Sequence, residues 1–326
     1  MRLRGAYVAR RILYALIALF AVMILNFLIP RAVPGNPVDI FANPRILPAI
    51  ETKILTQRFG LNRPVWEQFV LYIEGIFQWP PNFGVSFKYY PTPVWNVILA
   101  YLPWTLLLVG ISTIATAVVG ILVGIWTGSR PGTKSDTAVT SVSMLLWTMP
   151  FFWLGTLLLW IFGLDLHWFP LGGTQSIFSS QLNWYQKIGD IASHAFLPAL
   201  TLTLAAFAGY SLIMRNTLVE ELSQDYIMMS EAKGLKRWQI IIKHAARNAM
   251  LPMITLVGLN LGYVVSGALL VEVVFSYQGV GWLTYEAVLY HDYPLLQGLF
   301  FILSVTVILA NLIADLLYVS IDPRIK

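Results

Sequence analysis

The side chains that most often do chemistry are few and scattered in this chain of 326 residues. It has no cysteine, and its four histidines lie in different segments, at His167, His194, His244 and His291. Metal sites need several ligands held close together, and thiol catalysis and disulfides need cysteine. The sequence therefore predicts no metal site, no disulfide and no thiol chemistry.

The motifs of common catalytic sites are also missing. The chain contains neither the phosphate loop G-x-x-x-x-G-K-[ST], nor the zinc protease motif H-E-x-x-H, nor the hydrolase motif G-x-S-x-G. We therefore expect no catalytic residue and no cofactor bound by this chain itself. A membrane enzyme is disfavoured, because it would need such a constellation.

The composition is that of a membrane protein. Hydrophobic residues make up 57% of the chain, charged residues 11%, and the mean hydropathy is +0.69, whereas soluble proteins carry about 25% charged residues. The formal net charge of +5 comes from 21 lysines and arginines, which are dispersed, unlike the basic patches of nucleic-acid-binding proteins. We expect membrane lipid as a partner, and no nucleic acid.

Six apolar stretches are long enough to cross a bilayer, which takes about 20 helical residues. They cover 9–30, 99–128, 137–163, 195–218, 249–271 and 294–320. The first has the basic flank of a signal peptide, but it is too long and no A-x-A cleavage site follows, so we expect a retained anchor. The sequence thus predicts an all-α polytopic membrane protein with six transmembrane helices and both termini on one side.

The distribution of positive charge predicts the orientation. With the N-terminus in the cytoplasm, the inner segments hold 14 lysines and arginines, and the short outer loops hold only Lys187. Six more lie in the segment 31–98, which counts weakly because long loops are translocated largely regardless of charge. We expect a protein of the cytoplasmic (inner) membrane with both termini cytoplasmic.

Two segments outside the spans are large enough to have structure of their own. Residues 31–98 are rich in proline and contain an amphipathic stretch from Val65 to Phe77, which predicts a small external cap that packs on the spans. Residues 219–248 form an inner segment. We divide the chain into 1–30 (cytoplasmic N-terminus and first span), 31–98 (external loop) and 99–326 (a core of five spans, with 219–248 as its cytoplasmic loop).

The spans carry few of the ionisable groups that ion-coupled transport requires. Asp315, Glu272 and His194 lie near span ends. Three further polar residues cannot titrate: Asn26, Asn260 and Asn311. Hydrogen bonds between helices also explain such residues, so an autonomous ion-coupled carrier is a remote alternative.

The small and aromatic residues of the spans do not identify the substrate path. Glycines of the second and fifth spans permit either close helix packing or a pathway lining: Gly110, Gly120, Gly124, Gly128, Gly258, Gly262 and Gly267. Four aromatic residues fit either an outer vestibule or an interfacial belt: Trp147, Phe151, Phe152 and Trp153. The sequence assigns no substrate-contacting residue.

The inner segment 219–248 combines charges with apolar residues at helical spacing. A first helix over 220–233 is predicted to stop at Gly234, because glycine readily adopts the left-handed conformation that closes a helix. A second helix over 236–248 would carry its apolar residues on one face: Trp238, Ile241, Ile242 and Ala245. Docking to a soluble partner fits this arrangement, and so does a basic hairpin that contacts anionic lipid.

Three runs follow one another in this segment: Gln224-Asp225-Tyr226, then Glu231-Ala232-Lys233-Gly234, then the run from His244 to Pro252. Their order resembles the cytoplasmic loop of binding-protein-dependent ABC importer permeases, in the dipeptide/oligopeptide branch. The chain departs from the general family motif, because Ser230 replaces an alanine and Leu251-Pro252 lie further from Gly234. The longer spacing is usual in that branch.

Matches to the same branch continue along nearly the whole chain. They include Pro34-Gly35-Asn36-Pro37, Gly60-Leu61-Asn62-Arg63-Pro64, Pro150-Phe151-Phe152-Trp153-Leu154-Gly155, Phe169-Pro170-Leu171-Gly172-Gly173, Glu272-Val273-Val274-Phe275-Ser276 and Asp322-Pro323-Arg324. Each match is weak alone, but their shared order and spacing are specific.

The resemblance implies the type I ABC importer permease fold, and a pore-forming subunit that imports oligopeptides or dipeptides or, alternatively, oligosaccharides. It implies as partners a second homologous permease subunit, two ATP-binding subunits that hold ATP and Mg, and an external solute-binding protein. It assigns ATPase coupling to Asp225, Tyr226, Ser230, Glu231, Ala232, Lys233, Gly234 and Leu235. We expect Tyr226, Ile227 and Met229 to be the apolar anchor of that contact.

Overall fold

The computed structural model describes residues 5–32, 62–261 and 268–321, and the helices and turns of these ranges include no strand, only an isolated bridge between Val85 and Pro93. The chain forms two compact units, Met1–Thr105 with Gln278–Lys326, and Leu106–Tyr277. Helix α5 (Val94–Gly128) begins in the first unit and continues into the second. The predicted all-α fold is confirmed.

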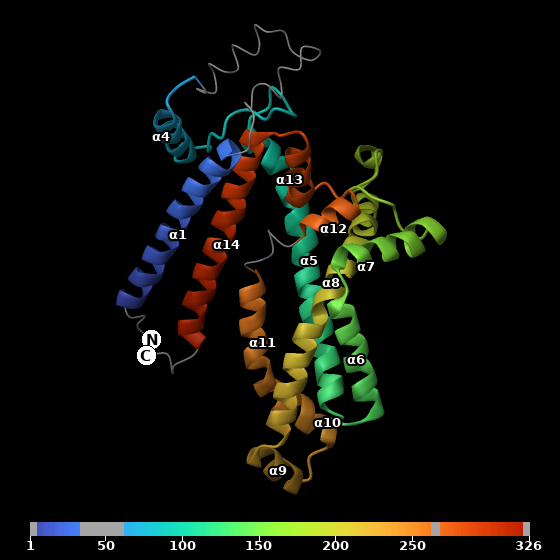
Figure 1. Cartoon of the computed structure of the whole chain (residues 1–326). Coiled ribbons are helices and arrows are strands. Elements are labelled where there is room, and N and C mark those ends of the chain that lie inside the picture. The colour runs from blue at the N-terminus through green and yellow to red at the C-terminus, as the bar shows by residue number, and fades with distance from the viewer. Residues whose placement is uncertain (1–4, 33–61, 262–267, 322–326) are drawn as a thin grey trace. The chain divides into compact units, whose positions relative to one another are not determined.

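The first unit packs α1 (Gly5–Ala32) against α14 (Tyr293–Ile321), with α4 (Val65–Ile76) beside the end of α1 (Figure 1). The Asn26 amide donates to the Gln297 carbonyl oxygen at 2.7 Å and to the Tyr72 hydroxyl at 3.0 Å, and so ties the three helices together. Helix α4 confirms the amphipathic helix predicted at 65–77. Residues 33–61 of the predicted external segment lie outside the described part.

A buried carboxyl group fastens residues 86–88 of the first unit to the start of α14. Asp292, fully buried between α13 (Val280–Leu289) and α14, accepts hydrogen bonds from the Ser86 hydroxyl at 2.5 Å and from the backbone N–H groups of Phe87 at 2.8 Å and Lys88 at 3.1 Å. The Lys88 ammonium also pairs with Glu286. These donors satisfy a polar group that would otherwise be costly to bury, and burial raises the pKa of the Asp292 carboxyl.

The second unit is built on a close contact between α5 and α8 (Trp184–Leu222). A Cβ atom at Gly120 would lie 2.5 Å from the Tyr210 Cβ, and one at Gly124 would lie 2.6 Å from the Met214 Cβ. Close packing is therefore confirmed for these two glycines and for Gly128, whose Cβ would lie 3.0 Å from the Arg215 carbonyl oxygen. Close packing is not found at Gly110, where a Cβ would meet nothing within 4 Å. The structure describes no side-chain surroundings for Gly258, Gly262 and Gly267.

The stretch predicted as one span over 137–163 is bent instead. Helix α6 (Lys134–Thr148) ends just before Pro150, and α7 (Phe151–Leu158) continues as a π-helical stretch, Leu159–Asp165, at an angle of 103° to α6. Proline has no N–H to donate and disfavours helical backbone at the residue before it. The proline explains why the helix stops at this point, and the stretch predicted as a span over 137–163 is a bent pair of helices.

A buried ion pair joins the start of α6 to the far end of α8. The Arg215 guanidinium donates through Nε to one oxygen of Asp136 at 2.7 Å and through Nη2 to the other at 2.6 Å. Only 3% of the Asp136 side chain is exposed. A two-pronged contact of this kind fixes the relative rotation of two helices as well as their distance.

Three described helices are long and apolar enough to cross a bilayer, Val8–Ile29, Val94–Gly128 and Trp184–Leu222, or four if the bent pair counts as one span. Helix α14 has 29 residues, and within the part whose side chains are described its apolar stretch is Tyr293–Leu309. The expected span at 249–271 appears as α11 (Ala246–Leu261) and α12 (Leu269–Val274), between which residues 262–267 are not described. Six continuous spans are thus not found within the described ranges.

Candidate functional site

The segment with the strongest sequence signal lies at the end of α8, where α9 (Asp225–Ala232) turns away from it (Figure 1). Glu220 and Glu221 belong to the last turn of α8, and the chain leaves the helix at Ser223. The predicted start of a separate helix at residue 220 was therefore wrong. Helix α8 thus positions α9 at its C-terminal end.

One face of α9 is buried against the rest of the second unit. Ile227 is 3% exposed and packs in a cluster with Leu218 of α8 and Ile240 of the following π-helical stretch, Ile240–Ala245. Ser230 is also buried, and its hydroxyl donates to the Tyr226 carbonyl oxygen at 2.8 Å. Ile227 consequently stabilises the loop and cannot be the docking anchor that we expected.

A polar network holds the start of α9. The Tyr226 hydroxyl donates to the Glu221 carboxylate, and the Asn248 amide donates to the Tyr226 oxygen at 3.1 Å. The Tyr226 phenol is protonated at neutral pH in any case, and burial and the bond to Glu221 raise its pKa further. Three helices, α8, α9 and α11, are thereby joined through one tyrosine.

The predicted glycine stop is confirmed. Gly234 has φ +74°, its N–H donates to the Glu231 carbonyl oxygen at 2.8 Å, and Leu235 donates to the Ser230 carbonyl oxygen at 3.4 Å. Backbone with positive φ is disfavoured for residues that have a Cβ. The chain then reverses into α10 (Arg237–Gln239).

The second helix of the loop is present, but its apolar residues do not share one buried face. Ala245 is buried, whereas Trp238 is 55% exposed and Ile242 is 51% exposed. A π-helical stretch interrupts the regular helix here, which shifts the side chains that follow from their expected positions. The prediction of a single apolar face was wrong, and Ile240 takes the buried place.

The outer side of α9 presents a mixed surface that we name the α9 surface. Met228 and Met229 are 69% and 62% exposed, and the charged residues around them are exposed as well: Asp225, Glu231 and Lys233. Ala232 and Leu235 complete the exposed set, whereas Tyr226 is half-buried. The sequence did not single out Met228, although it lies next to Met229 and Ile227 in an otherwise polar helix. Methionine surfaces adapt readily to a partner.

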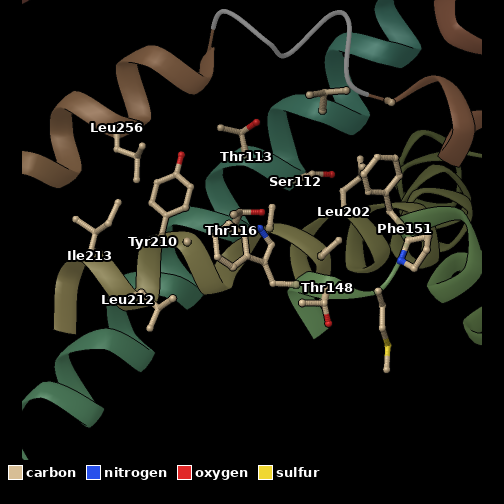
Figure 2. Close-up of a pocket in the computed structure, with 18 residues that line it drawn as sticks. Ser112, Thr113, Thr116, Thr148, Phe151, Leu202, Tyr210, Leu212, Ile213 and Leu256 are labelled. Atoms are coloured by element: carbon tan, nitrogen blue, oxygen red, sulfur yellow. The ribbon is translucent and has the colours of Figure 1, made fainter. Parts of the chain in front are cut away.

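A second candidate site is a cavity of about 780 Å³ within the second unit (Figure 2). Side chains of α5, α8 and α11 and the α6–α7 break surround it, among them Ser112, Thr116, Thr148 and Tyr210. Of the four aromatic residues considered for a vestibule, Trp147 and Phe151 line this cavity, and Phe152 and Trp153 do not. Neither site supplies metal ligands, since no cluster of three His, Cys, Asp or Glu occurs among the described residues.

Comparison with known proteins identifies the family. Residues 120–326 match the family described as "Binding-protein-dependent transport system inner membrane component", and residues 5–109 match the one described as "Binding-prot-dependent transport system membrane comp, N-term". The chain is 36% identical over 322 residues to the oligopeptide transport system permease protein AppB of Bacillus subtilis (strain 168), covering 99% of both chains. It is 33% identical over 339 residues to the dipeptide transport system permease protein DppB of Escherichia coli (strain K12), covering 98% of both. Because the family match spans more than half of the chain and these relatives match it from end to end, the chain belongs to the family of binding-protein-dependent transport system inner membrane components.

Proposed function

We propose that this chain is the pore-forming permease subunit of an ATP-driven, binding-protein-dependent ABC importer of oligopeptides or dipeptides. The observation that carries the proposal is the α9 surface, an exposed short helix held at the end of α8 in a family of transport-system membrane components. A component that shows no nucleotide-binding motif needs such a surface to receive mechanical work from an ATPase subunit.

The contacts of α9 suit the transmission of force. Ile227 and Tyr226 attach the helix to α8 and α11 from the inside, while Met228 and Met229 remain outside for a partner. Exposed apolar side chains provide contact area, and the charges around them set the register of the complex. Asp225, Glu231, Lys233 and the turn at Gly234 therefore belong to the contact, whereas Ser230 supports it from within.

The relatives favour peptides as the substrate. Both AppB and DppB are named as permeases, one for oligopeptides and the other for dipeptides, and they match over nearly the whole chain. An oligosaccharide importer of the same architecture has no such support.

The remaining parts of the importer follow from the same proposal. A second homologous permease subunit would complete the pore, two ATP-binding subunits would hold ATP and Mg, and an external solute-binding protein would deliver the peptide. The excess of positive charge in the inner segments supports an orientation with both termini in the cytoplasm.

The first test is to purify the tagged chain from its native membrane in mild detergent and to identify every polypeptide that accompanies it. We expect a second permease and ATP-binding subunits, with ATP hydrolysis by the complex. Recovery of this chain alone, without ATP hydrolysis in lipid nanodiscs, would refute the importer.

The second test addresses the α9 surface with the double substitution Met228→Glu and Met229→Glu. Two added carboxylates beside Asp225 and Glu231 would have to lose water on docking, so we expect ATP hydrolysis coupled to transport to fall about tenfold or more. Pro131→Glu, at an exposed turn between α5 and α6, is the matched control and should retain activity. Equal activity of the double variant and the wild type would remove α9 from the contact.

A further inference from the structure

The cavity of the second unit is notable for what surrounds it. Among its 18 lining residues are five hydroxyl groups, on Ser112, Thr113, Thr116, Thr148 and Tyr210, and there is no Asp, Glu, Lys, Arg or His. Figure 2 shows Ser112, Thr113 and Thr116 on α5 and Tyr210 on α8 around the same space. The 18 lining residues thus form a mostly apolar wall that carries hydroxyl groups but no charged side chain.

Two hydroxyl groups of the wall, those of Ser112 and Thr148, are placed to accept hydrogen bonds. Ser112 donates its own proton to the Leu108 carbonyl oxygen at 2.6 Å, and Thr148 donates to the Leu145 carbonyl oxygen at 2.9 Å. An oxygen whose proton is used in this way keeps its lone pairs for another donor. Backbone N–H groups of an extended peptide are donors of the required kind.

The helix break supports a ligand site rather than a packing defect. Thr148, Met149 and Pro150, where α6 ends and α7 begins, line the cavity. Irregular backbone within a membrane is tolerated where it is buried in protein or lines a water-filled cavity, and transporters often build substrate sites from interrupted helices. The break and the hydroxyl groups converge on one space.

The remaining lining provides room and apolar contact. Three small residues of α8, Ala205, Ala206 and Gly209, form part of the wall, together with larger apolar groups such as Leu202 and Phe151. A Cβ atom at Gly209 would meet nothing within 4 Å. The volume of about 780 Å³ lies within the range of about 300–1,000 Å³ typical of small-ligand pockets.

We propose that this cavity binds the uncharged part of a peptide in transit, with Ser112 and Thr148 accepting from its backbone N–H groups and the apolar wall holding its side chains. The proposal rests on the function proposed above. Because the wall holds no fixed charge, the cavity accepts side chains by size and polarity, and the charged termini lie outside it. A fixed charge introduced here should therefore create a selectivity that the natural site lacks.

Gly209→Asp, compared with the uncharged Gly209→Asn of nearly the same size, tests this directly. The full complex in liposomes is given three tripeptides that differ only in a central Leu, Lys or Glu. We expect the ratio of Lys-peptide to Glu-peptide uptake to rise about tenfold in the Asp variant relative to the Asn variant, since like charges repel strongly in a poorly hydrated site. The comparison cancels any selectivity of the binding protein, which is the same in both.

Gly189 offers a matched control on the same helix. A Cβ there also meets nothing within 4 Å, and the residue does not line the cavity. The Gly189→Asp and Gly189→Asn variants should transport the Lys and Glu peptides in the same ratio. An equal shift at both positions would indicate a general effect of charge and would overturn the assignment.

A second measurement decides the matter if the Asp variant fails to assemble. Because the chain has no cysteine, Gly209→Cys introduces its single thiol, and the unsubstituted complex reports any labelling of the partner chains. We expect saturating Leu-peptide to slow maleimide labelling at position 209 several-fold and to leave Gly189→Cys unaffected. Labelling at an unchanged rate with peptide present would mean that the peptide does not enter the cavity, and a thiol that never reacts would mean that protein or lipid fills it; either result would overturn the assignment. If the wild-type complex imports none of the peptides, the proposed function itself fails; if it imports them and the variants show neither effect, only the cavity assignment fails.

Discussion

At the scale of single residues, Gly234 is the position that most clearly requires a glycine. Its backbone has φ +74°, and apart from Gly234 and its two chain neighbours no atom lies within 4 Å of where a Cβ would be. A substitution would therefore act through backbone strain and not through a clash. This distinction allows a sharp test.

We expect Gly234→Val to impair the coupling of ATP hydrolysis to transport far more than Gly234→Asn. Asparagine tolerates the left-handed region, whereas a β-branched residue is an outlier there, at a cost on the order of 1–3 kcal/mol. The measurement is peptide-stimulated ATP hydrolysis by the purified complex, with the amount of chain in the membrane as the control for insertion. Equal activity of the Val and Asn variants would show that the turn at Gly234 does not matter to coupling.

The pairing of Asp136 with Arg215 illustrates the limit of sequence reasoning for residues. Both are charged residues next to or within apolar stretches, and they lie 79 positions apart. In the sequence, Arg215 is one of the 14 lysines and arginines of the inner segments, and nothing there indicates its partner. Which carboxylate it meets depends on how α6 and α8 pack.

At the scale of elements, the contact between α5 and α8 depends on the absence of side chains. The Cβ of an alanine at Gly124 would lie 2.6 Å from both the Met214 Cβ and the Ser211 carbonyl oxygen. At Gly110, on the same helix, the space is open. One chemical change at two positions should therefore have opposite effects.

We expect Gly124→Ala to lower the stability of the protein by roughly 1–3 kcal/mol, because the helices must separate or bend. Gly110→Ala should leave stability unchanged or raise it by up to about 1 kcal/mol, because alanine is the better helix former. Thermal unfolding of the two variants in the same detergent measures the difference. A similar midpoint for both would contradict the close packing of α5 on α8.

The bend between α6 and α7 shows how an element-scale prediction can miss a visible signal. The apolar run over 137–163 favoured one straight span, although Pro150 stands within it. Many membrane helices tolerate a proline with only a kink, so the residue alone does not distinguish a kink from a bend of 103°. The packing of α7 on α8 and α12 decides the direction.

At the scale of the whole molecule, the orientation in the membrane is the prediction with the widest consequences. Gln78 follows α4, and Gln224 precedes α9; both side chains are exposed. In the proposed orientation Gln78 faces the outside and Gln224 the cytoplasm. The natural absence of cysteine makes single thiols informative at both places.

A membrane-impermeant maleimide applied to intact cells or spheroplasts should label the Gln78→Cys variant and spare the Gln224→Cys variant. Permeabilised membranes should label both, because neither side chain is buried. The reverse pattern would invert the topology and place the α9 surface beyond the reach of a cytoplasmic ATPase.

Much of this protein was determined by its sequence alone. The hydropathy, the low charge and the absence of catalytic motifs indicated a helical membrane transporter component, and the order of short motifs indicated its family. The amphipathic α4 and the glycine stop at Gly234 were also predicted correctly, because both depend on local backbone and side-chain preferences.

Only the tertiary structure decided which side of each element is buried and which side can contact a partner or a ligand. It buried Ile227 and left Met228 outside, paired Asp136 with Arg215, bent the chain at Pro150 and brought five hydroxyl groups together around one cavity. Hydropathy and periodicity describe one segment at a time, whereas these features depend on contacts between segments far apart in the chain. Inside a membrane the ambiguity is greater, since an apolar side chain is equally at home against lipid and against another helix.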